Sequence, residues 1–274
     1  MPTRIGVYAL AAGLLAFSGS AMADINIKIG VLNDRSGIYA DLAGQGSVVA
    51  AQLAVEDYDA AAKGINVEII SADHQNKTDV GANIARQWID RDDVDVIADV
   101  PGSAIALAVS EIVAERGRIQ LNSGAGTGEL TGAACTANTI HWTYDTWALA
   151  HGTGSAMVQQ GGDTWFFIAA DYAFGYAMQR DTAAVVEGAG GKVVGSVNHP
   201  LGNSDFSSFL LQAQASGAKV IGLANGGGDT INTVKQAAEF GITQAGQKFA
   251  GLGSCIHIAS AGQFPCGCQF PAGS

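Results

Sequence analysis

The stretch VDVIADVPGSAIALAV, residues 94–109, contains the structural unit that decides the fold. Its first half, VDVIADV (94–100), is a short apolar run of the kind that forms a strand buried on both faces of a parallel sheet. Proline and glycine at 101–102 end that strand. Apolar residues at helical spacing follow and predict a helix that packs by one face: Ile105, Val109, Ile112 and Val113.

The same strand–helix unit recurs along the chain in two series. The first series has further apolar runs at 27–32, 67–70 and 118–121, with helical patterns at about 48–58 and 78–91. The second has runs at 165–169, 192–197 and 219–224, followed by helical patterns at about 174–188, 206–216 and 229–240. Alternating strands and helices form right-handed βαβ units, which predicts an α/β protein with doubly wound parallel sheets. An aromatic and polar segment separates the series and predicts a domain crossing near 141–147.

The N-terminus has the three parts of a secretory signal peptide. Arg4 precedes an apolar run at 5–17, and Ala21-Met22-Ala23 supplies the small residues of a cleavage site. The apolar run is too short to span a membrane permanently. The sequence therefore predicts a signal peptide at 1–23 and an exported, soluble mature chain. A buried first helix is the alternative interpretation.

The composition argues against several classes of function. The chain has a net charge of −11 and no basic stripe, so nucleic acid is not expected as a partner. The cysteines lack the spacing of a metal site, and the glycine-rich stretches lack the phosphate-loop lysine and the dinucleotide fingerprint, so no cofactor is predicted. The scattered histidines provide no nucleophile–base pair, and the chain is not predicted to be an enzyme.

Ligands of open α/β sheets bind beyond the carboxyl ends of the strands, and several of these ends carry polar or small residues. Ser103 begins a helix, where its hydroxyl and the free backbone N–H groups suit a carboxylate or a phosphate. The alternative is that it only caps the helix. The stretch LNSGAGTGELTG (121–132) allows close approach of its backbone, although many surface loops are glycine-rich. Asp229 is interpreted first as a helix cap.

The motifs IKIGVLNDRSGIYADLAGQG (27–46), VDVIADVPGSAIALAV, LNSGAGTGELTG and FFIAADYAFG (166–175) occur in this order in an exported chain. Together they resemble the periplasmic substrate-binding proteins of branched-chain amino acid type ABC transporters, over about residues 25–251. The resemblance implies two Rossmann-like lobes, at 24–143 and, incompletely, at 144–251, that close on a ligand in the periplasm. It also implies a non-enzymatic function: capture of a small carboxylate or amino acid and its delivery to membrane permease subunits.

The resemblance further implies ligand-binding positions. In the first lobe the ligand carboxylate is expected on Ser103, Ala104, Gly124, Ala125, Gly126 and Thr127. The second lobe is expected to contribute Tyr172, Phe174, Asn225 and Asp229.

Departures from the family pattern bear on the ligand. Amino-acid binders of the family have a threonine near Gly126 and a tyrosine near Gly226, and their glutamate for the ligand ammonium has no match from Ser254 onward. The resemblance implies a branched-chain amino acid as ligand, whereas these departures favour a carboxylate without an α-amino group, such as an aromatic acid. Candidate lining aromatics, each of which could instead belong to the core, are Tyr39, Tyr144, Tyr172 and Phe174. Trp142 is expected in the core. A ligand-sensing module on the same fold is the alternative function.

The resemblance stops near residue 251. The segment 252–274 lacks strand–helix rhythm, contains three of the four cysteines and is broken by glycine and proline. It is predicted to be an irregular tail outside the family pattern, the mark of a truncated or frame-shifted product. The preceding residues, 248–251, are predicted to begin a strand.

Overall fold

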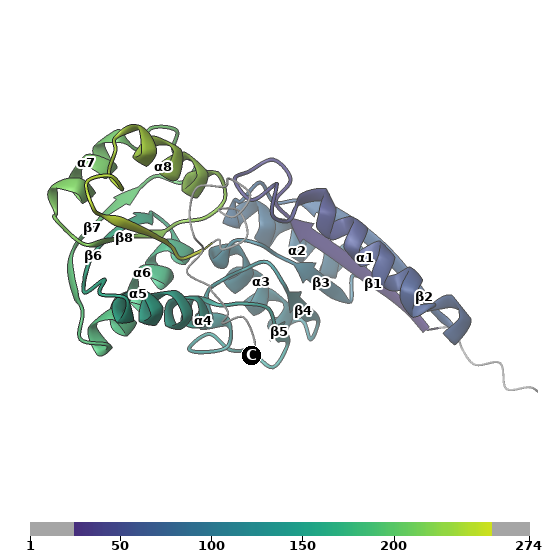
Figure 1. The fold of residues 1–274 in the computed structure, drawn as a ribbon. Helices are drawn as coiled ribbons and strands as arrows, with labels where there is room; N and C mark the ends of the chain where they lie inside the picture. Colours follow the sequence, from purple (N-terminus) through teal and green to yellow (C-terminus); the bar gives the residue numbers. More distant parts are fainter. Residues whose placement is uncertain (1–24, 254–274) are drawn as a thin grey trace, which may run out of the picture.

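The computed structural model describes residues 25–253, so the predicted signal peptide and nearly all of the predicted tail lie outside the described residues. The described chain forms two lobes, each built on its own parallel sheet (Figure 1). This arrangement confirms the predicted α/β class with two Rossmann-like lobes. Within 25–253 no helix is both long and apolar enough to cross a membrane.

The first lobe contains a five-stranded sheet in the order β2-β1-β3-β4-β5. Its strands, all paired in parallel, are β1 (Ile25–Asn33), β2 (Ile65–Asp73), β3 (Val96–Asp99), β4 (Ile119–Asn122) and β5 (Thr139–His141). The connecting helices are α1 (Gly44–Tyr58), α2 (Thr78–Arg91) and α3 (Ser103–Glu115), with short 3-10 turns η1 (Ala61–Lys63) and η2 (Gly128–Leu130). Because the strands run the same way, their carboxyl ends meet at one edge of the sheet.

The second lobe contains a four-stranded parallel sheet in the order β7-β6-β8-β9. Its strands are β6 (Thr164–Ala170), β7 (Lys192–His199), β8 (Val220–Ala224) and β9 (Lys248–Gly251). Its helices are α6 (Ala173–Gly188), α7 (Ser207–Ala215) and α8 (Gly228–Glu239).

One continuous helical stretch leads from the first lobe to the second. It consists of α4 (Thr146–Leu149), a π-helical turn η3 (Ala150–Gly154) and α5 (Ser155–Gln159). The chain therefore changes sheets between the end of β5 and the start of β6. The predicted boundary between the lobes, at 143–144, falls in this interval and stays a prediction.

Each lobe has a hydrophobic core of its own. In the first lobe α2 and α3 pack side chains such as Trp88, Ile105 and Val109 against Leu32 and Ile97 of the sheet. Burying each large apolar side chain stabilises the fold by roughly 1.5–3 kcal/mol. The core thus fixes the strand ends from which the first-lobe loops emerge.

The second sheet is covered on both faces, with α5 and α6 on one side and α7 and α8 on the other (Figure 1). Strand β6 supplies both cores because its side chains alternate in direction. Trp165 and Phe167 belong to the α6 side, whereas Phe166 and Ile168 belong to the α7 side.

Most local predictions agree with the observed elements. Helix α2 has the predicted bounds, and the predicted apolar face of α3 is buried. Strand β9 is present at 248–251; Leu252 after it is buried in the second core. Strand β5 was not predicted, because three residues are too few to show a period. The expectation that Trp142 lies in the core is wrong, since this side chain is 56% exposed.

Candidate functional site

A cavity of about 460 Å³ lies between the lobes, at the carboxyl ends of both sheets. Its volume is within the range of small-molecule sites, roughly 300–1,000 Å³. The first lobe lines it with the loops after β1, β3 and β4, and the second lobe with residues that follow β6, β8 and β9. The lining side chains on which its chemistry depends are Tyr39, Asp99, Ser103, Tyr144, Tyr172 and Phe174.

Asp34 shapes the loop after β1 and thereby positions Tyr39. The carboxylate of Asp34 is buried and accepts hydrogen bonds from the backbone N–H groups of Gly37 (2.7 Å) and Tyr39 (3.0 Å). The Tyr39 hydroxyl is buried at the cavity and has no hydrogen-bond partner among the described residues. Burial above all, and then the nearby Asp229, raises the pKa of Tyr39 well above its usual value. The neutral phenol is therefore available as a donor.

The loop after β3 has a backbone conformation that ordinary residues rarely adopt. The φ angle is +76° at Asp99, +53° at Val100 and +95° at Gly102. A positive φ is costly for a β-branched residue, and such strain clusters at binding sites. Asn122 holds the turn, because its Nδ2 donates to the Val100 carbonyl (3.2 Å) while its Oδ1 accepts the N–H of Ala125 (3.0 Å). Asn122 thus ties the loop after β3 to the loop after β4.

Ser103 is the first residue of α3 and faces the cavity. Its side chain is 1% exposed, and its hydroxyl has no partner among the described residues. The N-cap is Gly102, which offers no side chain to the helix, so the first N–H groups of α3 have no side-chain cap. The alternative that Ser103 only caps the helix is therefore wrong. A free hydroxyl at an uncapped helix N-terminus suits an anion.

Tyr172 and Phe174 line the cavity from the second lobe, at the start of α6. Gly175 makes this placement possible, because an added Cβ would lie 2.0 Å from the carbonyl oxygen of Ala170. Only glycine lets the helix begin directly against the end of β6. Both aromatic residues line the cavity and also pack on the second core, and their contact with a ligand stays a prediction.

Two glycines lie where the lobes approach each other closely. A Cβ on Gly126 would lie 2.6 Å from Cε2 of Phe174, and one on Gly226 would lie 3.4 Å from Cε1 of Tyr39. In each case the glycine belongs to one lobe and the ring to the other. The first departure from the family pattern thus has a steric reason, because a Cβ on Gly126 would be too close to the Phe174 ring, whereas a Cβ on Gly226 would make only an ordinary contact with Tyr39.

Asn225 and Asp229 are buried inside the second lobe and do not line the cavity. The Oδ1 atom of Asn225 accepts a hydrogen bond from the Thr230 hydroxyl (2.7 Å), and its Nδ2 lies 3.1 Å from Nε2 of His199. Asp229 accepts the N–H of Gly202 (3.1 Å). These bonds hold both side chains within the lobe, so the structure does not bring them to the wall of the cavity.

The remaining predicted positions divide into two groups. Those that line the cavity are Ser103, Gly124 and Gly126, and those that do not are Ala104, Ala125 and Thr127. Ala125 packs into the first core. The Thr127 hydroxyl accepts the N–H of Glu129 (3.3 Å) and caps the turn η2. These two side chains therefore support the loop rather than face the cavity.

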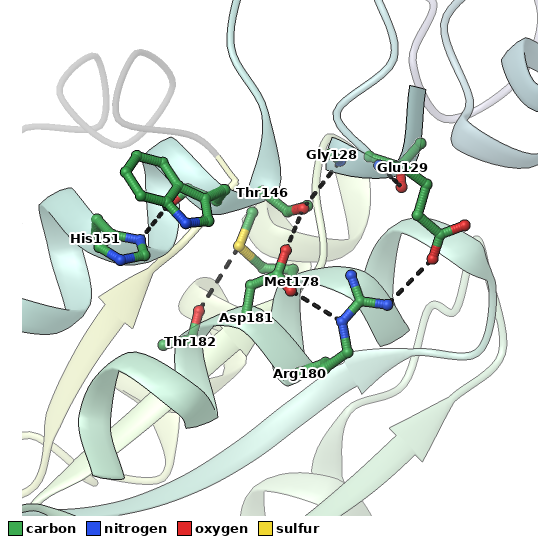
Figure 2. A network of polar contacts seen from close by, with 10 residues as sticks. Gly128, Glu129, Thr146, His151, Met178, Arg180, Asp181 and Thr182 are labelled. Carbon is green, nitrogen blue, oxygen red and sulfur yellow. Dashed lines mark hydrogen bonds and ion pairs between the residues drawn. The ribbon is translucent and has the colours of Figure 1, made fainter. Parts of the chain in front are cut away.

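A polar network joins the lobes where α4 meets α6 (Figure 2). Thr146 donates its hydroxyl hydrogen to Asp181 of α6 (2.6 Å) and accepts the N–H of Gly128 (3.3 Å). Arg180 of α6 contacts Asp181 (2.9 Å) and Glu129 of the first lobe (3.1 Å). The network holds α6, which carries the second-lobe cavity residues, against the loop after β4.

The cavity is lined by neutral donors rather than by cations. Among residues 25–253 no lysine, arginine or histidine lines it, and Asp99 is its one charged residue. Burial raises the pKa of Asp99. Tyr144 is 42% exposed, and partial burial of its phenol, followed by the proximity of Asp99, raises its pKa. In the described part of the chain, no three His, Cys, Asp or Glu side chains could together hold a metal ion.

Asp99 and Asn122 are part of this site but not of the sequence-based prediction. Each ends a strand of the first sheet, and each is almost fully buried. The available signal was a polar side chain at the carboxyl end of an otherwise apolar strand, where ligands of such sheets bind.

The family model described as periplasmic binding protein matches residues 26–263. The chain belongs to the periplasmic binding protein family. Two lobes with a cavity between the carboxyl ends of their sheets are the corresponding structural features.

Solved structures of related periplasmic binding proteins share this fold. A periplasmic binding protein from Burkholderia mallei is 50% identical, with a TM-score of 0.83 over 86% of this chain and 63% of its own. A branched chain amino acid ABC transporter periplasmic ligand-binding protein from Burkholderia xenovorans LB400 is 41% identical, with a TM-score of 0.71 over the same shares. An ABC transporter solute binding protein from Rhodopseudomonas palustris HaA2, in complex with p-hydroxybenzoic acid, is 25% identical, with a TM-score of 0.73 over 82% of this chain and 61% of its own. This periplasmic binding protein thus spans less than two thirds of their length.

Proposed function

We propose that this chain is the ligand-binding component of an ABC importer, which captures a small carboxylate in the periplasm and delivers it to membrane permease subunits. The observation that carries the proposal is the hydroxyl of Ser103. It is buried, faces the cavity and has no partner at the N-terminus of a 13-residue helix. Family membership and the transporter proteins among the similar structures support the same function.

The ligand carboxylate would be held by the Ser103 hydroxyl and by the first N–H groups of α3. Both are donors, and the positive end of the helix dipole favours a negative charge at this position. A hydrogen bond to a charged group contributes about 1.5–3 kcal/mol. Neutral donors are therefore sufficient for a monocarboxylate without a lysine or an arginine in the cavity.

The second lobe would cover the ligand with Tyr172 and Phe174. A ligand shifts the lobes toward the closed state only by making contacts that the open state lacks. The rings of Tyr39, Tyr144, Tyr172 and Phe174 give the cavity an aromatic wall, which suits the apolar part of a branched-chain amino acid or of an aromatic acid.

The proposal is tested by calorimetric titration of the 274-residue chain with L-leucine and with 4-hydroxybenzoate. Ser103→Ala should weaken binding of the preferred acid by at least about tenfold, since it removes a charge-assisted hydrogen bond. Ser110→Ala is the matched control, because Ser110 lies on the same helix and bonds Thr139 (2.7 Å) away from the cavity. Equal affinities of wild type and Ser103→Ala, with α3 intact by circular dichroism, would contradict the proposal.

A further inference from the structure

The Asp99 side chain has one carboxylate oxygen engaged and one free. Oδ1 accepts a hydrogen bond from the Ser123 hydroxyl (2.9 Å). Oδ2 is buried and has no partner among the described residues. The side chain is 7% exposed and lines the cavity. A buried carboxylate oxygen without a donor is costly, because it has lost its water and gained no hydrogen bond.

The loop after β4 leaves Asp99 accessible from the cavity. A Cβ on Gly124 would lie 3.0 Å from Oδ1 of Asp99 and 2.9 Å from the backbone of Pro101. Any larger residue would therefore crowd the carboxylate. The backbone N–H groups of Ser123 and Gly124 donate to the Asp99 carbonyl (3.2 and 3.1 Å), which fixes the aspartate against this loop.

The strained backbone at Asp99 has a direct consequence for the side chain. With φ at +76°, Asp99 leaves the regular course of β3 at its last residue, and its side chain reaches the cavity instead of the sheet interior. Two consecutive non-glycine residues with positive φ persist only where the surroundings hold them. The fold thus maintains an unfavourable backbone that places an acceptor in the cavity.

The cavity therefore presents two kinds of unpartnered polar atom. The hydroxyls of Tyr39 and Ser103 can donate to a ligand carboxylate, whereas Oδ2 of Asp99 is suited to accept. Burial raises the pKa of Asp99, while the neighbouring side chains of Ser47, Ser123 and Asn33 lower it. A hydrogen-bond donor on the ligand would also lower the pKa of Asp99 and so stabilise its ionised carboxylate.

We propose that Oδ2 of Asp99 is a specificity-determining acceptor for a hydrogen-bond donor on the ligand. The cavity then selects carboxylates that carry a second, donating group, an ammonium or a hydroxyl, over carboxylates that carry none. This inference rests on the proposed function and names its substrate class. A ligand without the donor would leave Asp99 buried and unpaired after closure, and sites of this kind reject such analogues strongly.

The test uses two pairs of acids that differ only in the donor. L-Leucine is compared with 4-methylpentanoate, which lacks the ammonium, and 4-hydroxybenzoate with benzoate, which lacks the hydroxyl. Affinities are measured by calorimetry on the full chain, on Asp99→Ala and on Asp99→Asn. Asp163→Asn is the control, because Asp163 pairs with Lys219 (2.7 Å) at the opposite end of the second sheet from the cavity.

We expect wild type to prefer the donor-bearing member of one pair by at least about tenfold. Asp99→Ala should remove that preference by weakening the donor-bearing acid alone, and Asp163→Asn should retain it. Asp99→Asn distinguishes the two donors. In Asp99→Asn the neutral amide keeps an acceptor oxygen, so a hydroxyl-bearing acid should still be preferred. An ammonium-bearing acid loses its counter-charge in Asp99→Asn as it does in Asp99→Ala, so its preference should be lost in both variants.

Two results would overturn the inference while leaving the proposed function in place. One is equal affinity for both members of each pair in wild type, a measurement that does not depend on any variant folding. The other is a preference that survives in Asp99→Ala. Absence of binding by all four acids would overturn the proposed function and this inference with it.

Discussion

The two walls of the cavity differ in what their polar atoms do. On the first-lobe wall, the hydroxyls of Tyr39 and Ser103 and one oxygen of Asp99 are buried without partners. In the second lobe, Asn225 and Asp229 are equally buried, but neighbours in the same lobe occupy their hydrogen-bonding atoms. The second-lobe wall presents aromatic rings and glycine backbone instead.

Under the proposed function, this difference corresponds to separate tasks for the two lobes. The first lobe holds polar atoms whose burial is costly until a ligand pairs with them, which suits it to recognition. The second lobe would add apolar contact area that exists only when the lobes are close, which suits it to closure. In the same proposal, the close fit of Gly126 against Phe174 contributes to closure.

The largest effect is expected from Gly126→Thr, which restores the residue type that the family pattern has near this position. Its Cβ would lie 2.6 Å from the Phe174 ring, so the buried ring or the lobe that carries it would have to move. Ligand affinity should fall by about 100-fold or more, because the closed state becomes rarely populated. Calorimetry and the radius of gyration from small-angle scattering measure the two consequences.

Phe174→Ala in the Gly126→Thr background should recover part of the lost affinity, since it removes the ring that the threonine meets. No recovery, or an unchanged radius of gyration in Gly126→Thr, would mean that this contact does not control closure.

The next largest effect concerns how the stability of the first lobe depends on pH, because this lobe buries His74. Burial lowers the pKa of His74 to about 4 from an ordinary 6.5, against the opposing influence of Asp34 and Asp73. Between these pH values the unfolded chain binds a proton that the folded chain does not. The contribution of His74 to the free energy of unfolding is therefore fully present above pH 6.5. It falls by about 3 kcal/mol as the pH is lowered to about 4.

Urea unfolding at a series of pH values checks this expectation. His74→Asn should reduce the loss, since its side-chain oxygen can accept the Asn76 N–H as Nδ1 of His74 does (3.0 Å). His151→Asn, which replaces an exposed histidine, is the matched control. The same acid-induced loss in wild type and His74→Asn would rule His74 out as its cause.

Asn225→Ala tests the contrast between the two lobes. It should lower the free energy of unfolding by about 1–3 kcal/mol, because it leaves the Thr230 hydroxyl without its buried acceptor. Ligand affinity of the folded protein should change by less than about threefold, well below the tenfold expected for Ser103→Ala. A tenfold loss of ligand affinity without a change in the free energy of unfolding would show that Asn225 contributes to ligand binding.

The smallest effect on ligand affinity is expected from Arg180→Ala. Arg180 links Glu129 of the first lobe to α6, but its side chain is 57% exposed. Exposed ion pairs contribute roughly 0–1 kcal/mol and are screened by salt. Affinity should change by less than about threefold at low salt, and not measurably at 1 M salt, in calorimetric titrations. A large, salt-independent loss would show that this pair controls closure.

The sequence by itself determined the strands and helices and therefore the loops at which the site lies. The apolar periods that identify α2, α3 and β6 are local properties of the chain, and each can be seen within a few turns or residues. Ser103 was predicted because it directly follows such an element, whereas Tyr172 and Phe174 were expected from the resemblance to the family. Strand β5 escaped prediction because its three residues form a strand only by pairing with β4.

Only the tertiary structure decided which polar groups are free. Asn225 and Asp99 both follow or end a buried strand, and in the sequence they look equally suited to bind a ligand. Asn225 contacts His199, which is 26 residues away, whereas no hydrogen bond to Oδ2 of Asp99 forms within the described part of the chain. Partners that distant leave no pattern in the local sequence. The opposite-lobe rings beside Gly126 and Gly226 are hidden for the same reason, since they reach those glycines only when the two lobes come together.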